Sequence, residues 1–499
     1  MKRLTDIISY DDIAEWSPND VILISAGTGA GKSYFIKNVL YEYAKARGLK
    51  ILMLVHRHNC HVQFQAELKE AGKTDVVHLK TYQSLEYKVL NQYSIDLRGY
   101  AFIVMDEGHY FLEDSSFSST TEESFDLIMN QANAIKILMS ATSENIRKFL
   151  HYSKGVKTVD YDVPVDYSNI RSLTFFNKDD SLETLMREAI THKIKTIFFI
   201  SSVEKAYKLF KQFKKLAIFN CSKSNSKYRF VNENKINEML VNEKFNELIL
   251  ITTAALDAGV NIVDTDLKRI VVDITDTSSL VQCVGRKRTQ DENDKVDLYI
   301  KSINNNRLGG IETKTRKKVR MAQYLKSHTV KEFIEKYPRT QDMHNIIYDV
   351  STSEGTHTKK VNELAYSKCL LTIESINKMK KRGDFGYPKT IAEIFGFYDS
   401  ETGEGRYRIF EDEREKDSVQ LFLTQNVNTL LHRDLQKELI DVCNIRDYRN
   451  RQQKSIGAIE AYFIENGFPY SVKSKKVKRN KKLVTIWTIT EKQTKPEAA

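Results

Sequence analysis

The stretch VILISAGTGAGKS, residues 21–33, decides how the first part of this chain folds. Its apolar run predicts a buried strand that ends in a glycine-rich turn, after which Gly-Lys-Ser opens a helical segment. Backbone N–H groups of such a turn can bind an anionic phosphate at the helix N-terminus. The alternative is a flexible glycine-rich turn without a ligand. The residues predicted to hold phosphates are Gly27, Thr28, Gly29, Ala30, Gly31, Lys32 and Ser33.

Within this loop, two side chains have distinct chemistry. Lys32 is predicted to reach the β- and γ-phosphates of ATP, and the Ser33 hydroxyl to bind Mg²⁺. A second stretch, AFIVMDEGH at residues 101–109, reads as a buried parallel strand that ends in two carboxylates. Asp106 is placed to complete the Mg²⁺ site, and Glu107 to orient and deprotonate the attacking water. A solvated acidic turn is the alternative, which the upstream phosphate loop disfavours.

These stretches and six others resemble the motifs of superfamily 2 helicases of the DExH type, in the family's order. AGTGAGKS, DEGH and SAT resemble motifs I, II and III, at residues 26–33, 106–109 and 140–142. LVHR and TYQSL resemble motif Ia and the next nucleic-acid-contacting motif, at residues 54–57 and 81–85. TIFFISS, TTAALDAGVN and QCVGRKR resemble motifs IV, V and VI, at residues 196–202, 252–261 and 282–288. The match spans roughly residues 20–300.

The resemblance implies roles for residues outside the phosphate loop. Arg286 would contact the γ-phosphate, and Arg288 would stabilise transition-state charge, because the usual second arginine position is occupied by Thr289. A motif VI ending of this kind is similar to that of herpesvirus-type origin-binding helicases and related phage or plasmid proteins. The remaining residues implied are Gln282 in catalysis; Gly259 and Asn261 at the nucleotide, Asn261 in place of an acidic ribose contact; His109, Ser140 and Thr142 in coupling; and Arg57, Thr81, Ser84, Ser202, Thr252 and Thr253 at the nucleic acid.

Strand and helix patterns alternate twice along the chain, which predicts an α/β fold with two tandem doubly wound parallel sheets. By the resemblance these are RecA-like lobes, joined near residues 160–164. A loop is expected at residues 304–310 and a linker at residues 350–360. The predicted domains are a first lobe at residues 1–165, a second lobe at 166–305, a helical accessory region at 306–430 and a basic winged-helix-like module at 431–499.

The end of the chain is predicted to bind nucleic acid. A helix at residues 454–465 precedes two strands at 470–475 and 483–490, and residues 446–499 hold thirteen Lys/Arg against five Asp/Glu, a net charge of +8. A solubilising basic tail is the alternative, but Tyr470 and Trp487 favour a folded module. The predicted phosphate contacts are Lys475, Lys476, Lys478, Arg479, Lys481 and Lys482.

Composition agrees with a partner of opposite charge. The 499 residues carry a formal net charge of +11, which points to a polyanion. The five cysteines are widely spaced, which favours free thiols in a reducing compartment. No run is long enough to span a membrane, and the charged N-terminus is unlike a secretory signal. The expectation is therefore a cytoplasmic protein, in a bacterial cell or an infected host cell, without a membrane partner.

Taken together, the residues and the resemblance predict an ATP- and Mg²⁺-dependent DNA helicase or translocase. Its DNA would be single-stranded, forked or duplex, and its pathway the replication or recombination of a phage or mobile element, with partner proteins of that pathway. The alternatives are an RNA helicase, which shares the motor; the translocase subunit of a restriction or defence complex; and an origin-binding protein without enzymatic activity. The last has no use for Lys32, Asp106, Glu107 and Arg286.

Overall fold

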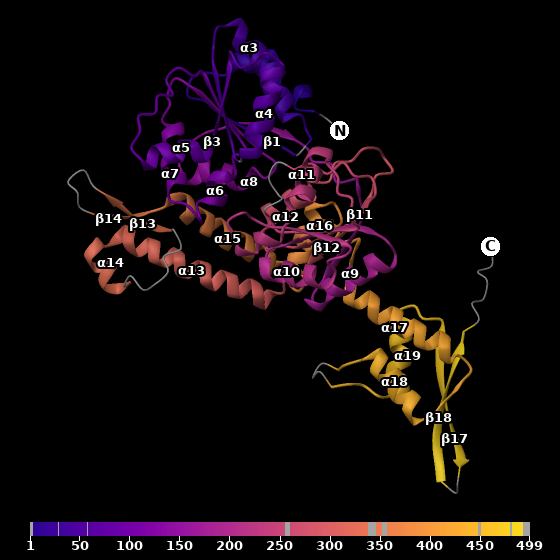
Figure 1. Cartoon of the computed structure of the whole chain (residues 1–499). Helices are drawn as coiled ribbons and strands as arrows, with labels where there is room; N and C mark the ends of the chain where they lie inside the picture. Colours follow the sequence, from indigo (N-terminus) through magenta and orange to yellow (C-terminus); the bar gives the residue numbers. More distant parts are fainter. Residues whose placement is uncertain are drawn as a thin grey trace. The chain divides into compact units, whose positions relative to one another are not determined.

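The computed structural model describes residues 3–27, 29–56, 58–254, 260–337, 346–351, 357–447, 451–479 and 482–492 (Figure 1). The chain divides into two compact units. The first, called here the N-terminal unit, comprises Met1–Leu173 and Glu183–Tyr407, and the second, the C-terminal unit, comprises Thr174–Leu182 and Arg408–Ala499.

The N-terminal unit begins with a six-stranded sheet in the order β3-β2-β4-β5-β1-β6. All neighbouring strands are parallel. Their bounds are β1 (Val21–Ala26), β2 (Ile51–Val55), β3 (Val77–Thr81), β4 (Phe102–Asp106), β5 (Ile135–Ser140) and β6 (Val159–Val163). This sheet and its helices form the first lobe.

Apolar side chains cover both faces of this sheet. Along β1, Ile22 and Ile24 belong to one hydrophobic core, whereas Val21 and Leu23 belong to the other, as the alternation of a strand requires. The continuous apolar runs therefore mark strands that are buried on both sides. The helical segments of the lobe are η1 (Leu4–Asp6), α1 (Tyr10–Glu15), α2 (Lys32–Tyr34), η2 (Phe35–Leu40), α3 (Tyr41–Ala46), α4 (His58–Glu70), α5 (Tyr82–Leu90), α6 (Tyr110–Asp114), α7 (Thr120–Met129), α8 (Glu144–Lys148) and η3 (Phe149–Ser153).

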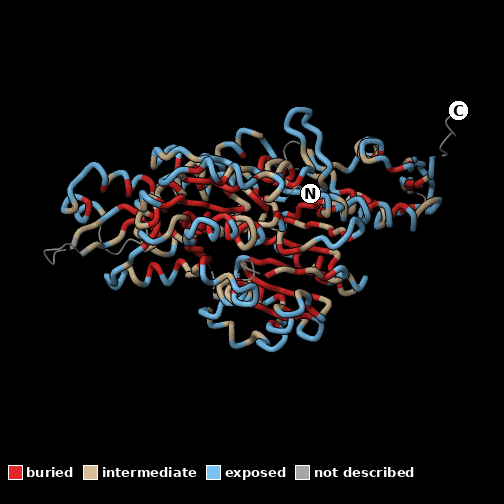
Figure 2. The backbone as a smooth tube through the Cα atoms, turned by 90° about the horizontal axis from the view of Figure 1, so that it is seen from above, coloured by how far each residue is buried: buried red, intermediate tan, exposed pale blue. Residues whose placement is uncertain are grey.

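A second sheet forms the second lobe. Five of its strands are parallel, in the order β12-β11-β8-β10-β9, and β7 lies beside β12. The prediction of two tandem α/β lobes with parallel sheets is confirmed. The bounds are β7 (Ile170–Phe176), β8 (Lys195–Ile200), β9 (Ala217–Asn220), β10 (Ile249–Thr252), β11 (Leu267–Asp273) and β12 (Val296–Lys301), with α9 (Asp180–Thr191), α10 (Val203–Gln212), η4 (Ser226–Phe230), α11 (Glu233–Asn242) and α12 (Thr277–Val284). Buried residues follow the strands (Figure 2).

The segment after β12 is mostly helical. The long helices α13 and α15 pack along each other (Figure 1). Its elements are α13 (Asn305–Ser327), α14 (Val330–Lys336), β13 (Ile347–Ser351), β14 (His357–Val361), α15 (Glu363–Lys381) and α16 (Gly386–Ile394).

Two expectations for this segment were wrong. The loop expected at residues 304–310 is the start of α13, because the Asn304 side chain caps the helix by accepting a hydrogen bond from the Arg307 N–H at 2.9 Å. Of the linker expected at residues 350–360, residues 350–351 belong to β13 and residues 357–360 to β14, which pair antiparallel, whereas residues 352–356 lie outside the described part. Across this hairpin the Lys359 Nζ lies 2.7 Å from the Asp349 Oδ1.

The C-terminal unit contains helices and a small antiparallel sheet in the order β16-β18-β17. Its core includes Phe422, Phe463 and Trp487, so the described part of this segment is folded and is not a solvated tail. As predicted, a helix precedes a β-hairpin. The bounds are β15 (Tyr407–Ile409), α17 (Phe410–Asn426), β16 (Leu430–Leu431), α18 (Arg433–Cys443), α19 (Ile456–Glu465), β17 (Tyr470–Arg479) and β18 (Lys482–Glu491).

A membrane-spanning element is not found among the described helices, since none combines sufficient length with sufficient apolar character. The domain boundaries at residues 165, 305 and 430 stay predictions. Residues 160–164, where the two lobes were expected to join, lie at the end of β6, so the connection between the sheets follows Val163.

Candidate active site

The phosphate loop connects β1 to α2. Gly29 and Gly31 each have a φ of +88°, in the left-handed region that glycine adopts without strain. The loop closes on itself, because the Ala30 N–H donates to the Gly27 carbonyl at 3.3 Å. The Lys32 Nζ donates to the carbonyl of Ala26 at 3.1 Å. The ammonium group of Lys32 is therefore held across the loop. Thr28 lies outside the described residues.

Neighbouring segments hold this loop from two sides. The Leu4 N–H donates to the carbonyl of the buried Ala30 at 2.9 Å. On the other side, a Cβ added to Gly27 would lie 3.0 Å from the Val165 side chain, in the connection that follows β6. A side chain at residue 27 would therefore press against Val165.

The two predicted carboxylates lie at the carboxyl end of β4. Glu107 has a φ of +52°, and the following Gly108 donates its N–H to the Met139 carbonyl at 2.8 Å. The Glu107 Oε1 lies 3.9 Å from the Lys32 Nζ. The Tyr82 hydroxyl donates to the Asp106 carbonyl at 2.9 Å and so fixes the strand end from α5. Both carboxylates therefore face the phosphate loop from the same sheet edge, where ligands of such sheets bind.

The electrostatic surroundings shift the pKa values of the two carboxyl groups in opposite directions. Burial raises the pKa of Asp106, and the adjacent Glu107 carboxylate raises it further. Burial would also raise the pKa of Glu107, but the nearby cations, Lys32 first and then Arg286, outweigh it and hold that pKa below its usual range. Glu107 is therefore an ionised carboxylate at neutral pH. Its Oε2 accepts no hydrogen bond from any described residue, which leaves it able to accept one from water.

His109 joins the first lobe to the second. The Gln282 Nε2 amide donates to the Nε2 of His109 at 2.6 Å, and the Nδ1 of His109 lies 2.9 Å from the Ser140 Oγ. Burial lowers the pKa of His109, so the ring is neutral. Because Nε2 accepts from the amide, the proton sits on Nδ1 and is donated to Ser140. The Ser140 Oγ also accepts from the Thr142 N–H at 2.9 Å.

The motif VI segment follows α12 as extended backbone beside Ile262. Ile262 donates its N–H to the Arg286 carbonyl at 2.8 Å, and the Arg288 N–H donates to the Ile262 carbonyl at 2.8 Å. Side chains alternate along extended backbone, so Arg286 and Arg288 share one side and Lys287 points to the other. Lys287 forms an ion pair there with Asp294, and both side chains are fully buried.

The two arginines face the nucleotide site. Arg286 is only 4% exposed, and its Nε has no hydrogen-bond acceptor among the described residues. A Cβ added to Gly29 would lie 3.6 Å from the Arg288 Nη1, which places this guanidinium at the phosphate loop. Burial, with Arg286 nearby, lowers the pKa of Arg288 to about 10, so it remains a cation at neutral pH.

These groups meet in one cleft of about 820 Å³ in the N-terminal unit. A volume of this size suits a nucleoside triphosphate. Of the predicted catalytic, nucleotide-binding and coupling residues, the structure places in its lining Gly29, Gly31, Lys32, Ser33, Asp106, Glu107, His109, Asn261, Gln282, Arg286 and Arg288.

Oxygen ligands for Mg²⁺ are available in this cleft. The Ser33 hydroxyl and the Asp106 carboxylate both line it. Mg²⁺ commonly takes one or two protein oxygens and completes its shell with water and substrate phosphates. The crowding of Asp106 against Glu107, which raises the pKa of Asp106, is a repulsion that a cation would relieve. The residues present therefore fit the ion.

The residues of the lobes that were predicted to contact nucleic acid have different surroundings in the structure. The Thr81 and Ser202 side chains cap α5 and α10, accepting from the Ser84 and Lys205 N–H groups at 3.1 and 3.3 Å. Thr253 lines the cleft. Thr252 is fully buried, and its hydroxyl donates to the Thr253 carbonyl at 3.1 Å, so this side chain offers no surface to a nucleic acid. Arg57 and Gly259 lie outside the described residues.

In the C-terminal unit, Lys475, Lys476 and Lys478 are exposed on β17. Lys481 lies outside the described residues, and so do the side chains of Arg479 and Lys482.

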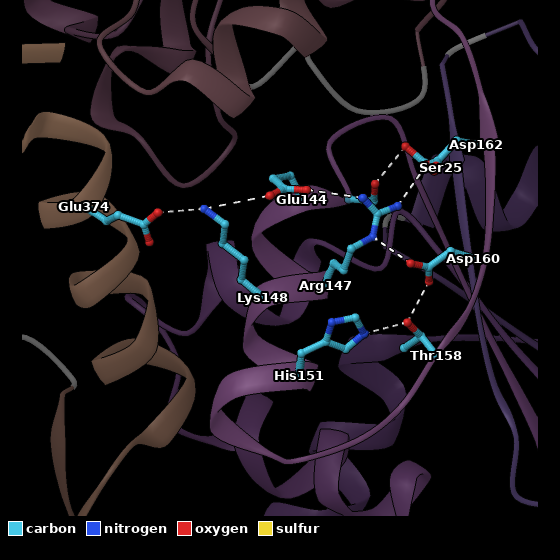
Figure 3. Close-up of polar contacts among 10 residues, drawn as sticks. Ser25, Glu144, Arg147, Lys148, His151, Thr158, Asp160, Asp162 and Glu374 are labelled. Carbon is cyan, nitrogen blue, oxygen red and sulfur yellow. Dashed lines mark hydrogen bonds and ion pairs between the residues drawn. The ribbon is translucent and has the colours of Figure 1, made fainter. Parts of the chain in front are cut away.

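The structure adds contacts that the motifs did not indicate. Ser143, one residue beyond the third motif, donates through its hydroxyl to the Ser25 hydroxyl of β1 at 2.8 Å. Figure 3 shows Arg147 of α8 between the carboxylates of Asp160 and Asp162, with Nη2 2.8 Å from the Asp162 Oδ1. On the same helix, Lys148 reaches Glu374 of α15 at 2.9 Å. The third motif is thus followed by a helix that ties β1, β6 and α15 together.

A second group missed by sequence lies just after the His109 turn. The Lys368 Nζ of α15 is 2.6 Å from the Glu113 Oε2, and Glu113 lines the cleft. Burial raises the pKa of Glu113, and so does Asp276 at the start of α12. No motif contains Lys368, because it lies eighty residues beyond the end of motif VI.

Comparison with known proteins agrees with part of this site. Residues 4–145 match the family described as "Type III restriction enzyme, res subunit". No curated protein matches the chain.

Solved structures resemble the chain at low identity. S. cerevisiae Dbp5 bound to RNA and ADP BeF3 is 14% identical over 59% of this chain and 82% of its own, with a TM-score of 0.42. Mycobacterium smegmatis helicase Lhr bound to ssDNA and AMP-PNP is 14% identical over 63% and 50%, with a TM-score of 0.41. The DUF1998 helicase MrfA bound to DNA and AMPPNP is 17% identical over 56% and 46%, with a TM-score of 0.42. The phosphate loop and the Asp106–Glu107 pair thus lie in the part of the chain that is similar to the type III restriction enzyme res subunit.

Proposed function

We propose that this chain is a nucleic-acid-dependent ATPase that works as a DNA helicase or translocase. The observation that carries the proposal is the single cleft that holds the phosphate loop, Glu107 and the two arginines of the second lobe. Groups that bind phosphate and groups that meet transition-state charge come from different lobes. ATP binding would therefore draw the lobes together, and hydrolysis would release them.

The chemistry follows from the positions of these groups. The phosphate loop and Lys32 bind the β- and γ-phosphates, and Glu107 orients the attacking water and takes its proton. Mg²⁺ bound by Ser33 and Asp106 would neutralise charge on the phosphates. Arg286 and Arg288 stabilise the charge that spreads over the transferred group. The His109–Gln282 hydrogen bond links this chemistry to the second lobe.

Three observations support nucleic acid as the polymer on which this ATPase acts. Thr253 lines the same cleft as the nucleotide-binding residues, so a nucleic-acid strand bound at Thr253 would be affected by closure of the lobes. The formal charge is +11, and residues 446–499 contribute +8 of it. The likeness of residues 4–145 to the res subunit family favours DNA. A role in the replication or recombination of a phage or mobile element is the pathway that we propose.

The direct test is the rate of ATP hydrolysis with single-stranded DNA, duplex DNA or RNA of matched length, followed by unwinding of tailed duplexes. We expect DNA to stimulate hydrolysis more than RNA. Stimulation by RNA alone would make the chain an RNA helicase, and an absence of hydrolysis with every nucleic acid would contradict the motor altogether.

A second candidate is the translocase subunit of a restriction or defence complex. The observation that favours it is the match of residues 4–145 to the res subunit. The two candidates differ in their products. A translocase subunit would hydrolyse ATP on duplex DNA without separating a tailed substrate, and would support DNA cleavage only with a nuclease partner.

We further propose that the C-terminal unit is a winged-helix-like DNA-binding module. Three helices, α17, α18 and α19, share one hydrophobic core with the β16-β18-β17 sheet, and the β17–β18 hairpin carries exposed lysines on β17. Val477 and Leu483 on the same hairpin are 38% and 72% exposed. An exposed cationic hairpin of this kind suits phosphate contacts.

Replacing Lys475, Lys476 and Lys478 by glutamine should weaken DNA binding and its salt dependence. If each lysine contacts a phosphate, the slope of log affinity against log salt falls by roughly 2 to 3. Fluorescence anisotropy at several salt concentrations measures this slope. The matched control replaces Lys416, Arg433 and Lys437, exposed cations on α17 and α18, and removes the same charge. An equal change in both variants would contradict a specific role for the hairpin.

A further inference from the structure

Arg288 is held by a side chain that the motif comparison assigned to another task. Its Nε donates to the Asn261 Oδ1 at 2.8 Å, and its Nη2 donates to the same oxygen at 2.6 Å. The Asn261 Nδ2 donates in turn to the Glu243 Oε1 at 3.0 Å. A carboxylate, an amide and a guanidinium thus form one hydrogen-bonded chain, in which each charged end strengthens its contact.

The backbone fixes each member of this chain. The bridge between Ile262 and Lys287 fixes Asn261 and Arg288 on neighbouring extended segments. The Val263 N–H donates to the Glu243 carbonyl at 2.9 Å, which fixes the third member beside the same segment. Glu243 itself ends α11 in the left-handed conformation, with a φ of +53°. The three side chains therefore meet through backbone contacts that do not depend on a ligand.

The free side of Arg288 faces the phosphate loop. Its Nη1 is the atom that lies 3.6 Å from a Cβ added to Gly29. Asn261 uses Oδ1 to accept two hydrogen bonds and Nδ2 to donate one, all within the protein. The amide is thus engaged at both ends by protein groups, which disfavours the contact to ribose expected at this position.

We propose that Asn261 and Glu243 are positioning residues that hold the Arg288 guanidinium toward the phosphate loop for hydrolysis. The inference rests on the proposed ATPase function and assigns the support of its shifted arginine. An arginine side chain has many rotamers. Fixing one of them before the reaction removes the entropic cost of ordering the side chain from the activation barrier. The proposal also explains how an arginine only two residues after Arg286 serves the site. The alternation of side chains directs both arginines toward the cleft, and Asn261 then fixes the orientation of Arg288.

The test compares steady-state ATP hydrolysis by four forms of the full chain with saturating nucleic acid: wild type, N261A, R288A and N261A/R288A. We expect N261A to lower kcat on the order of 10- to 100-fold, with KM for ATP changed by less than about 3-fold. In the R288A background, N261A should lower kcat by less than about 2-fold further, because residues that act as a unit are not additive.

Two further variants separate positioning from loss of folding. N261D/E243Q exchanges donor and acceptor between the two residues and keeps an oxygen facing Arg288, so it should recover most of the turnover that N261A loses. N246A is the matched control, because the exposed Asn246 makes the same amide-to-carboxylate contact, to the Glu238 Oε1 at 2.9 Å, elsewhere on the second lobe. It should turn over ATP as the wild type does.

The opposite results are equally clear. A rise in KM for ATP at unchanged kcat, together with a lost preference for ATP over 2′-deoxy-ATP, would make Asn261 a ribose contact and overturn the proposal. Equal fold losses from N261A with and without Arg288 would also overturn it. Wild-type protein without ATP hydrolysis would overturn the proposed function, and this inference with it, whereas normal wild-type turnover confines a failure to the inference.

Discussion

Replacing Lys32 by alanine should lower the rate of ATP hydrolysis by about 10²- to 10³-fold, the loss expected when one preorganised charge is removed from a transition state. The Lys32 ammonium lies across the phosphate loop, 3.1 Å from the Ala26 carbonyl and 3.9 Å from the Glu107 Oε1. No other lysine occupies this loop, so its charge has no replacement there. Steady-state hydrolysis at saturating ATP and nucleic acid measures the effect.

The same variant should bind nucleic acid with nearly unchanged affinity in the absence of ATP. Lys32 belongs to the first lobe, and the cationic hairpin belongs to the other compact unit. Lys45→Ala is a suitable control, since Lys45 is a half-exposed lysine of the same lobe that pairs with Asp75 at 3.4 Å. Wild-type turnover by Lys32→Ala would sink the assignment of this loop to the phosphates.

The two sheets could be predicted because their strands have a simple pattern. Buried parallel strands are apolar on both faces, so β1 and β4 appear in the sequence as short continuous apolar runs. The edge strand β6 is different: it carries Asp160 and Asp162, and Arg147 holds both carboxylates (Figure 3). Its residues were therefore interpreted as the connection between lobes, although they pair with β1.

Helix α13 shows why local composition was misleading. Two adjacent glycines at its start favour a loop by intrinsic propensity. Tertiary contacts outweigh that preference, because α13 packs along α15 and the Lys380 Nζ lies 2.6 Å from the Glu312 Oε2.

The candidate site was predictable in its parts but not in its contacts. Short motifs indicated Lys32, Glu107 and Arg286, because phosphate chemistry needs those residue types at particular sheet edges. Pairings between motifs depend on the fold, and Glu243 had no motif to indicate it. The two-residue spacing of the arginines became clear only with the backbone, where the buried Lys287–Asp294 pair occupies the opposite side.

Replacing Glu107 by glutamine should lower single-turnover hydrolysis by about 10²- to 10⁴-fold, the usual contribution of a general base. Glutamine keeps the size of the side chain but cannot take a proton from water. The wild-type carboxylate is ionised, because Lys32 and Arg286 hold its pKa below its usual range against the effect of burial. Asp106 remains in the variant, so Mg²⁺ and ATP should still bind, which a fluorescent ATP analogue can measure.

Blocked hydrolysis with intact binding makes a second expectation for Glu107→Gln. If ATP closes the lobes on nucleic acid, the variant should dissociate from DNA more slowly with ATP than with ADP. The wild type should dissociate at the same rate with either nucleotide once it has hydrolysed the ATP. Glu42→Gln is the control, since Glu42 is a half-exposed acid on α3 that pairs with Lys73 at 3.6 Å. Asp106→Asn provides the contrast, because it should weaken Mg²⁺-dependent nucleotide binding itself. Normal turnover by Glu107→Gln would mean that another group activates the water. In the lining of the described cleft, the other carboxylate beside Lys32 and the phosphate loop is that of Asp106.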